Sequence, residues 1–229
     1  MSTSVLQART KTRALGWRTR VIIGLAMLGA MLFILVAAVP YFSFVASEEL
    51  ARRSVEPVRF ASYWPKRAWL LTHIAGGLVA LLTGPAQLWL GLANQRMDLH
   101  RRLGLLYISG MIVGSIGAIG LAVQTDFGWV FGAGLFFLAI AWILTTGLAF
   151  IAIRKRQVQQ HKEWTIRSYV VTFAFVTFRV LYVVLQGAQI GDNTTQLAFS
   201  SWVCWAVPLL ITEVLLQGKK IFRPVGTSS

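Results

Sequence analysis

The chain of 229 residues is poor in charge, because only 13% of its residues are Asp, Glu, Lys or Arg. An ordinary soluble domain carries about twice that share, roughly 25%. Hydrophobic residues make up 56% of the chain, and the mean hydropathy is +0.64. This composition excludes a disordered chain, a fibrous protein and a typical water-soluble enzyme.

Cysteine and histidine are also scarce, which limits the kinds of site that the chain can build. The single cysteine, Cys204, excludes an intramolecular disulfide and a zinc site made from cysteine pairs. Three histidines leave room for one or two small metal or haem sites. The sequence contains no GxGxxG, GxxxxGK(S/T), HExxH or GxSxG motif. Whether the protein is an enzyme therefore stays open.

Long apolar runs are the main feature that is present. A helix needs about 20 mostly apolar residues to cross a bilayer, and six stretches meet or approach that length: 21–45, 68–92, 104–124, 128–153, 164–186 and 199–217. They predict an all-α membrane protein, a six-helix transmembrane bundle. The membrane domain then covers 21–217, between a basic tail over 1–20 and a second tail over 218–229.

The positions of Lys and Arg predict how this bundle is oriented. Sixteen of the 22 basic residues lie in the N-terminal tail, the second and fourth loops and the C-terminal end, whereas five lie in the first loop. Positive residues stay on the cytoplasmic side, so both termini are expected there, in a bacterial cytoplasmic (inner) membrane. The net charge of +14 then reflects topology and a match to anionic lipid head groups, not nucleic-acid binding.

Small and polar residues follow one face of several predicted helices. On the second span, small and polar residues are spaced three or four positions apart from His73 to Gly91, and Gln87 is one of them. This spacing places them on one face of the helix. A similar stripe on the fifth span runs from His161 through Ser168 and Arg179 to Gln186. In lipid, such faces pack on other helices or line a polar interior. We therefore expect His73, Gln87 and Arg179 to face the inside of the bundle.

Arg179 lies well inside the fifth predicted span, whereas Arg167 lies near the start of that span. An arginine at the centre of a membrane helix costs about 2.5–3.5 kcal/mol on insertion scales, so it usually has a partner or lines a wet cavity. Two alternatives stay open for it. Arg179 reaches the outer membrane surface and pairs with Asp126 or Asp192, or it binds a ligand.

His100 and His161 begin the third and fifth spans at matched depth on the predicted cytoplasmic side. Two histidines on neighbouring helices are the minimum for bis-imidazole haem ligation, so haem b is one alternative, and beyond it no metal site is expected. A shared anion or water is another. Tyr107 lies two helical turns after His100, and we expect it to meet Ser168 between the two helices.

Three ordered motifs carry a resemblance to a known family. They are Thr72–Gly77 with Gly84–Gln87, His100–Gly104 with Tyr107, and His161–Trp164 with Arg167–Tyr169 and Arg179. Between Arg67 and Gln186 the chain resembles the bacterial predicted membrane proteins grouped as domain of unknown function 2306. The resemblance implies a polytopic membrane protein and no particular activity. Its signature residues are His73, Gln87, His100, Tyr107, His161, Arg167 and Arg179.

Three functions stay open on the sequence. The first is a binding or transport module, in which the seven signature residues line a polar cavity for a small molecule. The second is a redox protein with one b-type haem on His100 and His161, exchanging electrons with quinol. The third is a non-catalytic assembly subunit that forms oligomers through its glycine-rich helix faces. The lipid bilayer is the expected partner in all three.

Overall fold

The computed structural model describes residues 28–29, 32, 36–93 and 96–221. All the regular structure within these residues is α-helical. A short apolar helix covers Val36–Ala46. The elements that follow it are α2 (Glu48–Ser54), α3 (Pro57–Tyr63), α4 (Arg67–Ala93), α5 (Met97–Val123), α6 (Trp129–Arg154), α7 (Val158–Thr172), α8 (Ala174–Gly187) and α9 (Asn193–Ile221).

Five helical stretches in the described residues are long and apolar enough to cross a membrane. They are α4, α5, α6, the combined stretch of α7 and α8, and α9. This confirms the prediction of an all-α membrane protein. The predicted first span is described only at 28–29, 32 and 36–45, all helical, so the sixth span and the side of the termini stay predictions. The tail over 1–20 lies outside the described residues, and 218–221 belong to the end of α9.

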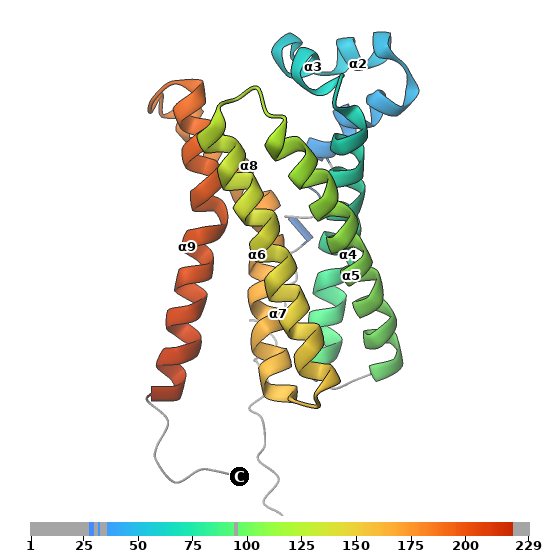
Figure 1. The fold of residues 1–229 in the computed structure, drawn as a ribbon, viewed down its shortest axis with the longest axis vertical. Helices are drawn as coiled ribbons and strands as arrows, with labels where there is room; N and C mark the ends of the chain where they lie inside the picture. Colours follow the sequence, from blue (N-terminus) through green and yellow to red (C-terminus); the bar gives the residue numbers. More distant parts are fainter. Residues whose placement is uncertain (1–27, 30–31, 33–35, 94–95, 222–229) are drawn as a thin grey trace, which may run out of the picture.

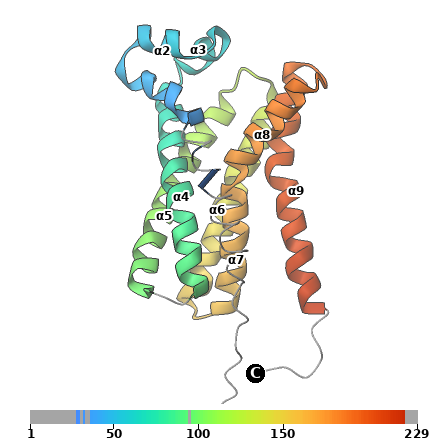
Figure 2. The same ribbon diagram turned by 180° about the vertical axis from the view of Figure 1, so that it is seen from behind.

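The helices run up and down, so their connections gather at two ends of the bundle (Figures 1 and 2). One end carries α2, α3 and the turn at Asp126, and is called the Asp126 end below. The other carries the α4–α5 and α6–α7 connections and is called the His100 end. At the Asp126 end, Lys66 Nζ lies 2.5 Å from Asp126 Oδ2, and Ser62 donates a 2.8 Å hydrogen bond to the same oxygen. These contacts tie α3 to the turn between α5 and α6.

Helices α4 and α5 pack closely because glycines of each face the other. A Cβ atom at Gly110 would lie 2.8 Å from the carbonyl oxygen of Gly76, and one at Gly114 would lie 3.1 Å from the amide nitrogen of Gly77. Small residues allow such backbone contact in membrane bundles. The faces of α4 and α5 that carry these glycines are thus covered within one chain.

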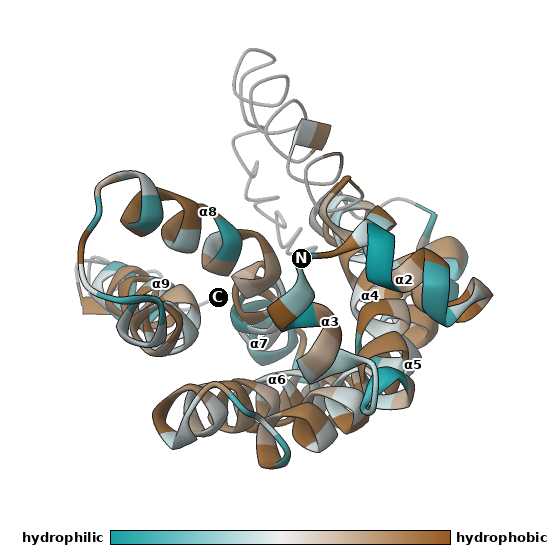
Figure 3. Cartoon of the chain, turned by 90° about the horizontal axis from the view of Figure 1, so that it is seen from above, coloured by the Kyte–Doolittle hydropathy of each residue, from teal (hydrophilic) through white to brown (hydrophobic). Residues whose placement is uncertain are grey.

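The fifth predicted span is broken in two at Phe173, where α7 ends and α8 begins. The amide of Phe173 still donates to Tyr169 O, but the amide of Val176 donates to Phe173 O in a tighter turn. Beyond the break α8 packs on α9, whereas α7 packs on α4, α6 and α9. The break therefore separates α8 from α4 in the half of the bundle toward the Asp126 end, as the view from above shows (Figure 3).

Candidate functional site

A cavity of about 680 Å³ lies where α4 and α8 separate. Its walls are mostly apolar: leucine and phenylalanine side chains from α4, α5, α6 and α8 line it, together with Trp142. A volume of this size is ordinary for a small-molecule site, since such pockets measure about 300–1,000 Å³. The lining is drawn from elements that are far apart in the sequence, so only the tertiary structure assembles the cavity.

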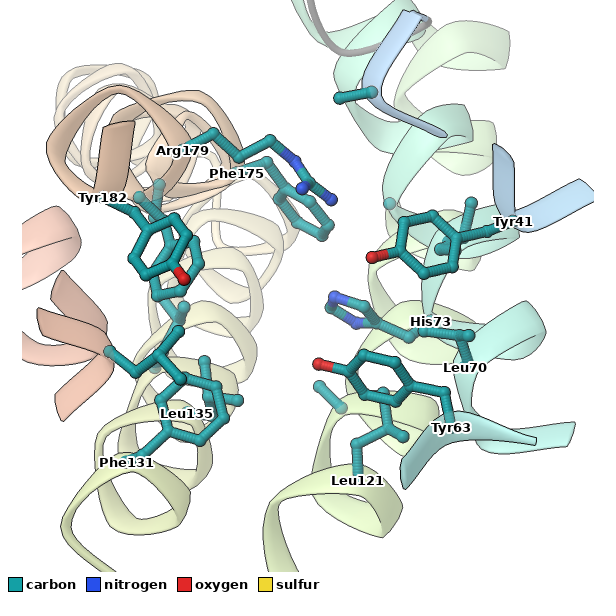
Figure 4. A pocket seen from close by; sticks show the side chains of 18 of the residues that line it. Tyr41, Tyr63, Leu70, His73, Leu121, Phe131, Leu135, Phe175, Arg179 and Tyr182 are labelled. Atoms are coloured by element: carbon teal, nitrogen blue, oxygen red, sulfur yellow. The ribbon is translucent and has the colours of Figure 1, made fainter. Parts of the chain in front are cut away.

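Five polar side chains point into this cavity from opposite walls (Figure 4). Arg179 and Tyr182 come from α8, His73 from α4, Tyr63 from α3, and Tyr41 from the helix over 36–46. The ring of His73 stacks on Phe175 with 4.9 Å between centroids, and its Nδ1 lies 3.0 Å from the carbonyl oxygen of Gly114. This confirms that His73 and Arg179 face the interior of the bundle.

Two of these five, Tyr41 and Tyr63, were missed by the sequence reasoning, as was Arg59, which also lines the cavity. They precede α4, in a region treated as the first span and its loop. The first loop did carry local signals of helices: Ser47 caps α2 by accepting a hydrogen bond from the Leu50 amide, and α3 begins at Pro57. Burial raises the pKa of Tyr63 to about 12, so its hydroxyl is a neutral hydrogen-bond donor.

Arg179 forms no ion pair with a carboxylate of the described residues. The expected pairs with Asp126 or Asp192 do not form, because Asp126 binds Lys66 and Ser62, and Asp192 accepts the amide of Thr195 at the start of α9. Hydrogen bonds from Lys66 and Ser62 lower the pKa of Asp126, which keeps it charged and committed to Lys66. Of the two alternatives left open for Arg179, the ion pair with Asp126 or Asp192 does not form in the structure.

A buried cluster of hydroxyl groups closes the cavity on the side of the His100 end. The hydroxyl of Tyr107 lies 2.7 Å from Ser168 Oγ and 2.6 Å from Thr172 Oγ1. Trp142 Nε1 donates to it at 3.5 Å, and Thr146 Oγ1 lies 2.6 Å from Ser168 Oγ. This confirms that Tyr107 and Ser168 meet between α5 and α7. The hydroxyl groups of the cluster thus form hydrogen bonds with one another. Tyr107 is not part of the cavity lining.

Arg167 likewise has partners inside the protein. Its guanidinium lies 2.5 Å from Glu213 Oε2 on α9 and 3.8 Å from Glu163 Oε2, and it stacks 4.7 Å above the ring of Trp164. Glu163 also accepts a 2.8 Å hydrogen bond from Lys220. These ion pairs join α7 to α9 near the His100 end. The sequence had suggested that the seven signature residues line one cavity. In the structure, only His73 and Arg179 of the seven line the cavity between α4 and α8.

His100 and His161 lie beside each other at the His100 end. Their ring centroids are 6.3 Å apart and their planes differ by 86°. His100 Nδ1 lies 3.0 Å from the carbonyl oxygen of Gln87 on α4, and His161 Nδ1 lies 2.9 Å from that of Ala149 on α6. The expected proximity of the two histidines is thus confirmed.

Comparison with protein families now identifies the group to which the chain is related. The sequence profile of a predicted membrane protein family, DUF2306, matches residues 70–216. The chain belongs to the DUF2306 family. Comparison with curated proteins and with solved structures gives no match.

The DUF2306 match extends from α4 into α9, and so contains most but not all of the site. His73 and Arg179 in the cavity lie within it, as do His100 and His161 at the other end. Tyr41, Arg59 and Tyr63 precede it. The DUF2306 region therefore supplies the walls of the cavity, and the residues before it supply part of the cover at the Asp126 end.

Proposed function

We propose that the protein is a membrane-embedded binding or transport module whose cavity accepts an amphipathic small molecule with an anionic group. The observation that carries this proposal is Arg179, a cation that lines a mostly apolar cavity and forms no ion pair with a described carboxylate. Glu56 lines the same cavity, but it pairs with Arg59. An unpaired charge removed from water is costly. A ligand anion that reaches Arg179 offsets that cost.

The count of acidic residues supports an external partner for Arg179. The chain has only eight Asp and Glu residues, and all of them are described. Six take part in ion pairs with other cations. Of the other two, Asp192 caps α9, and Asp98 lies in the first turn of α5 at the His100 end. The chain thus has no acidic side chain left for Arg179.

The rest of the lining fits an amphipathic ligand. Tyr63, Tyr182 and His73 supply hydrogen-bonding groups near Arg179 (Figure 4). Arg59 adds a second cation, partly neutralised by Glu56 at 3.6 Å. The leucine and phenylalanine walls accept an alkyl chain or an apolar ring. On the charge asymmetry of the loops, we assign the His100 end to the cytoplasm of a bacterial inner membrane and the cavity to the opposite half.

Fluorescence quenching tests the proposal, because Trp142 lines the cavity. The protein is placed in nanodiscs of zwitterionic lipid and titrated with a dibrominated fatty acid and with the matching dibrominated alcohol. We expect the acid to quench more strongly and to bind about tenfold more tightly, since a hydrogen bond to a charged group contributes about 1.5–3 kcal/mol. Because the chain has nine tryptophans, the signal of the cavity is the part of the quenching that Trp142→Phe removes.

Arg179→Gln should remove the preference for the acid. Arg52→Gln is the matched control, because Arg52 lies toward the same end but is exposed and paired with Glu48; this variant should retain the preference. Equal binding of acid and alcohol by the wild-type protein would overturn the proposal, as would an unchanged preference in Arg179→Gln.

A further inference from the structure

The pair of histidines at the His100 end is independent of the cavity and carries a separate inference. A backbone carbonyl can only accept a hydrogen bond, so Nδ1 of His100 and Nδ1 of His161 must each carry a proton to bond Gln87 O and Ala149 O. In the neutral rings the lone pair then belongs to Nε2. Neither Nε2 has a hydrogen-bond partner among the described residues, and neither is a fully buried unsatisfied atom.

This arrangement is the one that metal-binding histidines adopt. Such a histidine donates its second ring N–H to a carbonyl or carboxylate, which fixes the tautomer and the direction of the ring. Here the two carbonyls come from α4 and α6, whereas the histidines come from α5 and α7. Four helices therefore orient the pair.

The distance between the rings fits one metal centre held between them. An imidazole nitrogen binds a metal at about 2.0–2.1 Å and lies about 1.2 Å from its ring centre, so two imidazoles on opposite sides of one metal have centroids about 6.4 Å apart. The observed separation is 6.3 Å. Two imidazoles at the tetrahedral angle would give only about 5 Å by the same bond lengths.

We propose that His100 and His161 bind one transition-metal centre through their Nε2 atoms, from opposite sides of the metal. No group of three or more His, Cys, Asp and Glu residues that could hold a metal ion occurs within the part of the chain that the structure describes. The centre must therefore need only two protein ligands. Haem iron, which takes four nitrogens from its porphyrin, meets that condition, and so does two-coordinate Cu(I). A structural zinc ion, which takes four protein ligands, does not.

The surroundings of the pair suit such a centre. A Cβ atom at Gly91 would lie 2.9 Å from Cε1 of His100. A larger residue at this position would therefore displace the imidazole ring from α4. Arg101, Arg102 and Lys162 follow the two histidines and are exposed. Their charge matches haem propionates, which a bare copper ion would not require.

The experiment uses the full chain, purified in detergent from cells supplied with a haem precursor and with copper. Absorption spectra before and after dithionite detect haem, and elemental analysis gives iron and copper per chain. We expect about one metal centre per chain, with a Soret band if it is haem and copper without that band if it is the bare ion. His100→Ala and His161→Ala should each reduce the metal content several-fold. His73→Ala is the matched control, since His73 also bonds a carbonyl through Nδ1 but has no partner histidine, and it should retain the metal.

A measurement on the wild-type protein guards against variants that fail to fold. Electron paramagnetic resonance of the oxidised centre should show two imidazole nitrogens, and ferric haem should give the large-gmax low-spin signal of axial rings that are nearly perpendicular. The proposal is overturned if the wild-type protein contains no metal and binds neither haemin nor Cu(I) at one equivalent. Equal metal loss from His73→Ala, or no imidazole signal, would also overturn it. None of these results bears on the binding of a fatty acid near Arg179.

Discussion

The contact between α4 and α5 gives the most direct test of the packing. A Cβ atom added at Gly76 would lie 2.5 Å from the carbonyl oxygen of Gly110 and 2.6 Å from Cα of Gly114, and closer still to the amide nitrogen of Gly114. All three neighbours are backbone atoms on α5, so no side chain can rotate away. Gly76→Ala must push the two helices apart.

Gly147 on α6 provides the control, because a Cβ atom there would meet nothing within 4 Å. Both variants gain about 1 kcal/mol of helix propensity from the change to alanine. Overpacking costs about 1–3 kcal/mol, and the rigid backbone contacts at Gly76 favour the upper end of that range. We expect Gly76→Ala to be about 3 kcal/mol less stable than Gly147→Ala.

Unfolding in mixed micelles with increasing SDS, followed by circular dichroism, measures this difference in the free energy of unfolding. Displacement of α4 also moves His73, so Gly76→Ala should weaken binding in the cavity. If Gly76→Ala is as stable as Gly147→Ala, the close approach of α4 and α5 is not a feature of the folded protein, and the position assigned to His73 must be revised.

Two further predictions concern polar groups. Tyr107→Phe should lower the free energy of unfolding by about 1–3 kcal/mol, because it removes two buried hydrogen bonds and leaves Trp142 Nε1 without its acceptor. Tyr182→Phe, which loses exposed bonds to Asn193 and Gln186, should cost clearly less in the same SDS titration. The pKa of Asp126 is lowered by its bonds to Lys66 and Ser62. These bonds therefore stabilise the fold fully above the ordinary carboxyl pKa, about 4. Their contribution is lost as the pH falls through the lower pKa of the folded state. Thermal midpoints of the wild-type protein and Asp126→Asn should therefore differ at pH 6 and converge at low pH; a constant difference would contradict the sign of the pKa shift.

The sequence by itself determined the membrane class, five of the helical spans and the inward faces of His73 and Arg179. These features follow from local properties: the length of an apolar run must match the bilayer, and a polar residue within it must avoid lipid. The approach of His100 to His161 and of Tyr107 to Ser168 could also be predicted. It needed only helical periodicity and the antiparallel order of consecutive spans.

Only the tertiary structure decided which polar residues share a site. No Gly or Pro occurs between Val158 and Gln186, so nothing local marks the break at Phe173 that separates α8 from α4 and opens the cavity. Arg167 and Tyr107 were indistinguishable in sequence from ligand-binding residues, because their partners lie 46 and 61 residues away, on Glu213 and Ser168. A spacing pattern fixes the face of a helix that a side chain occupies, whereas its partner is fixed by how distant helices pack.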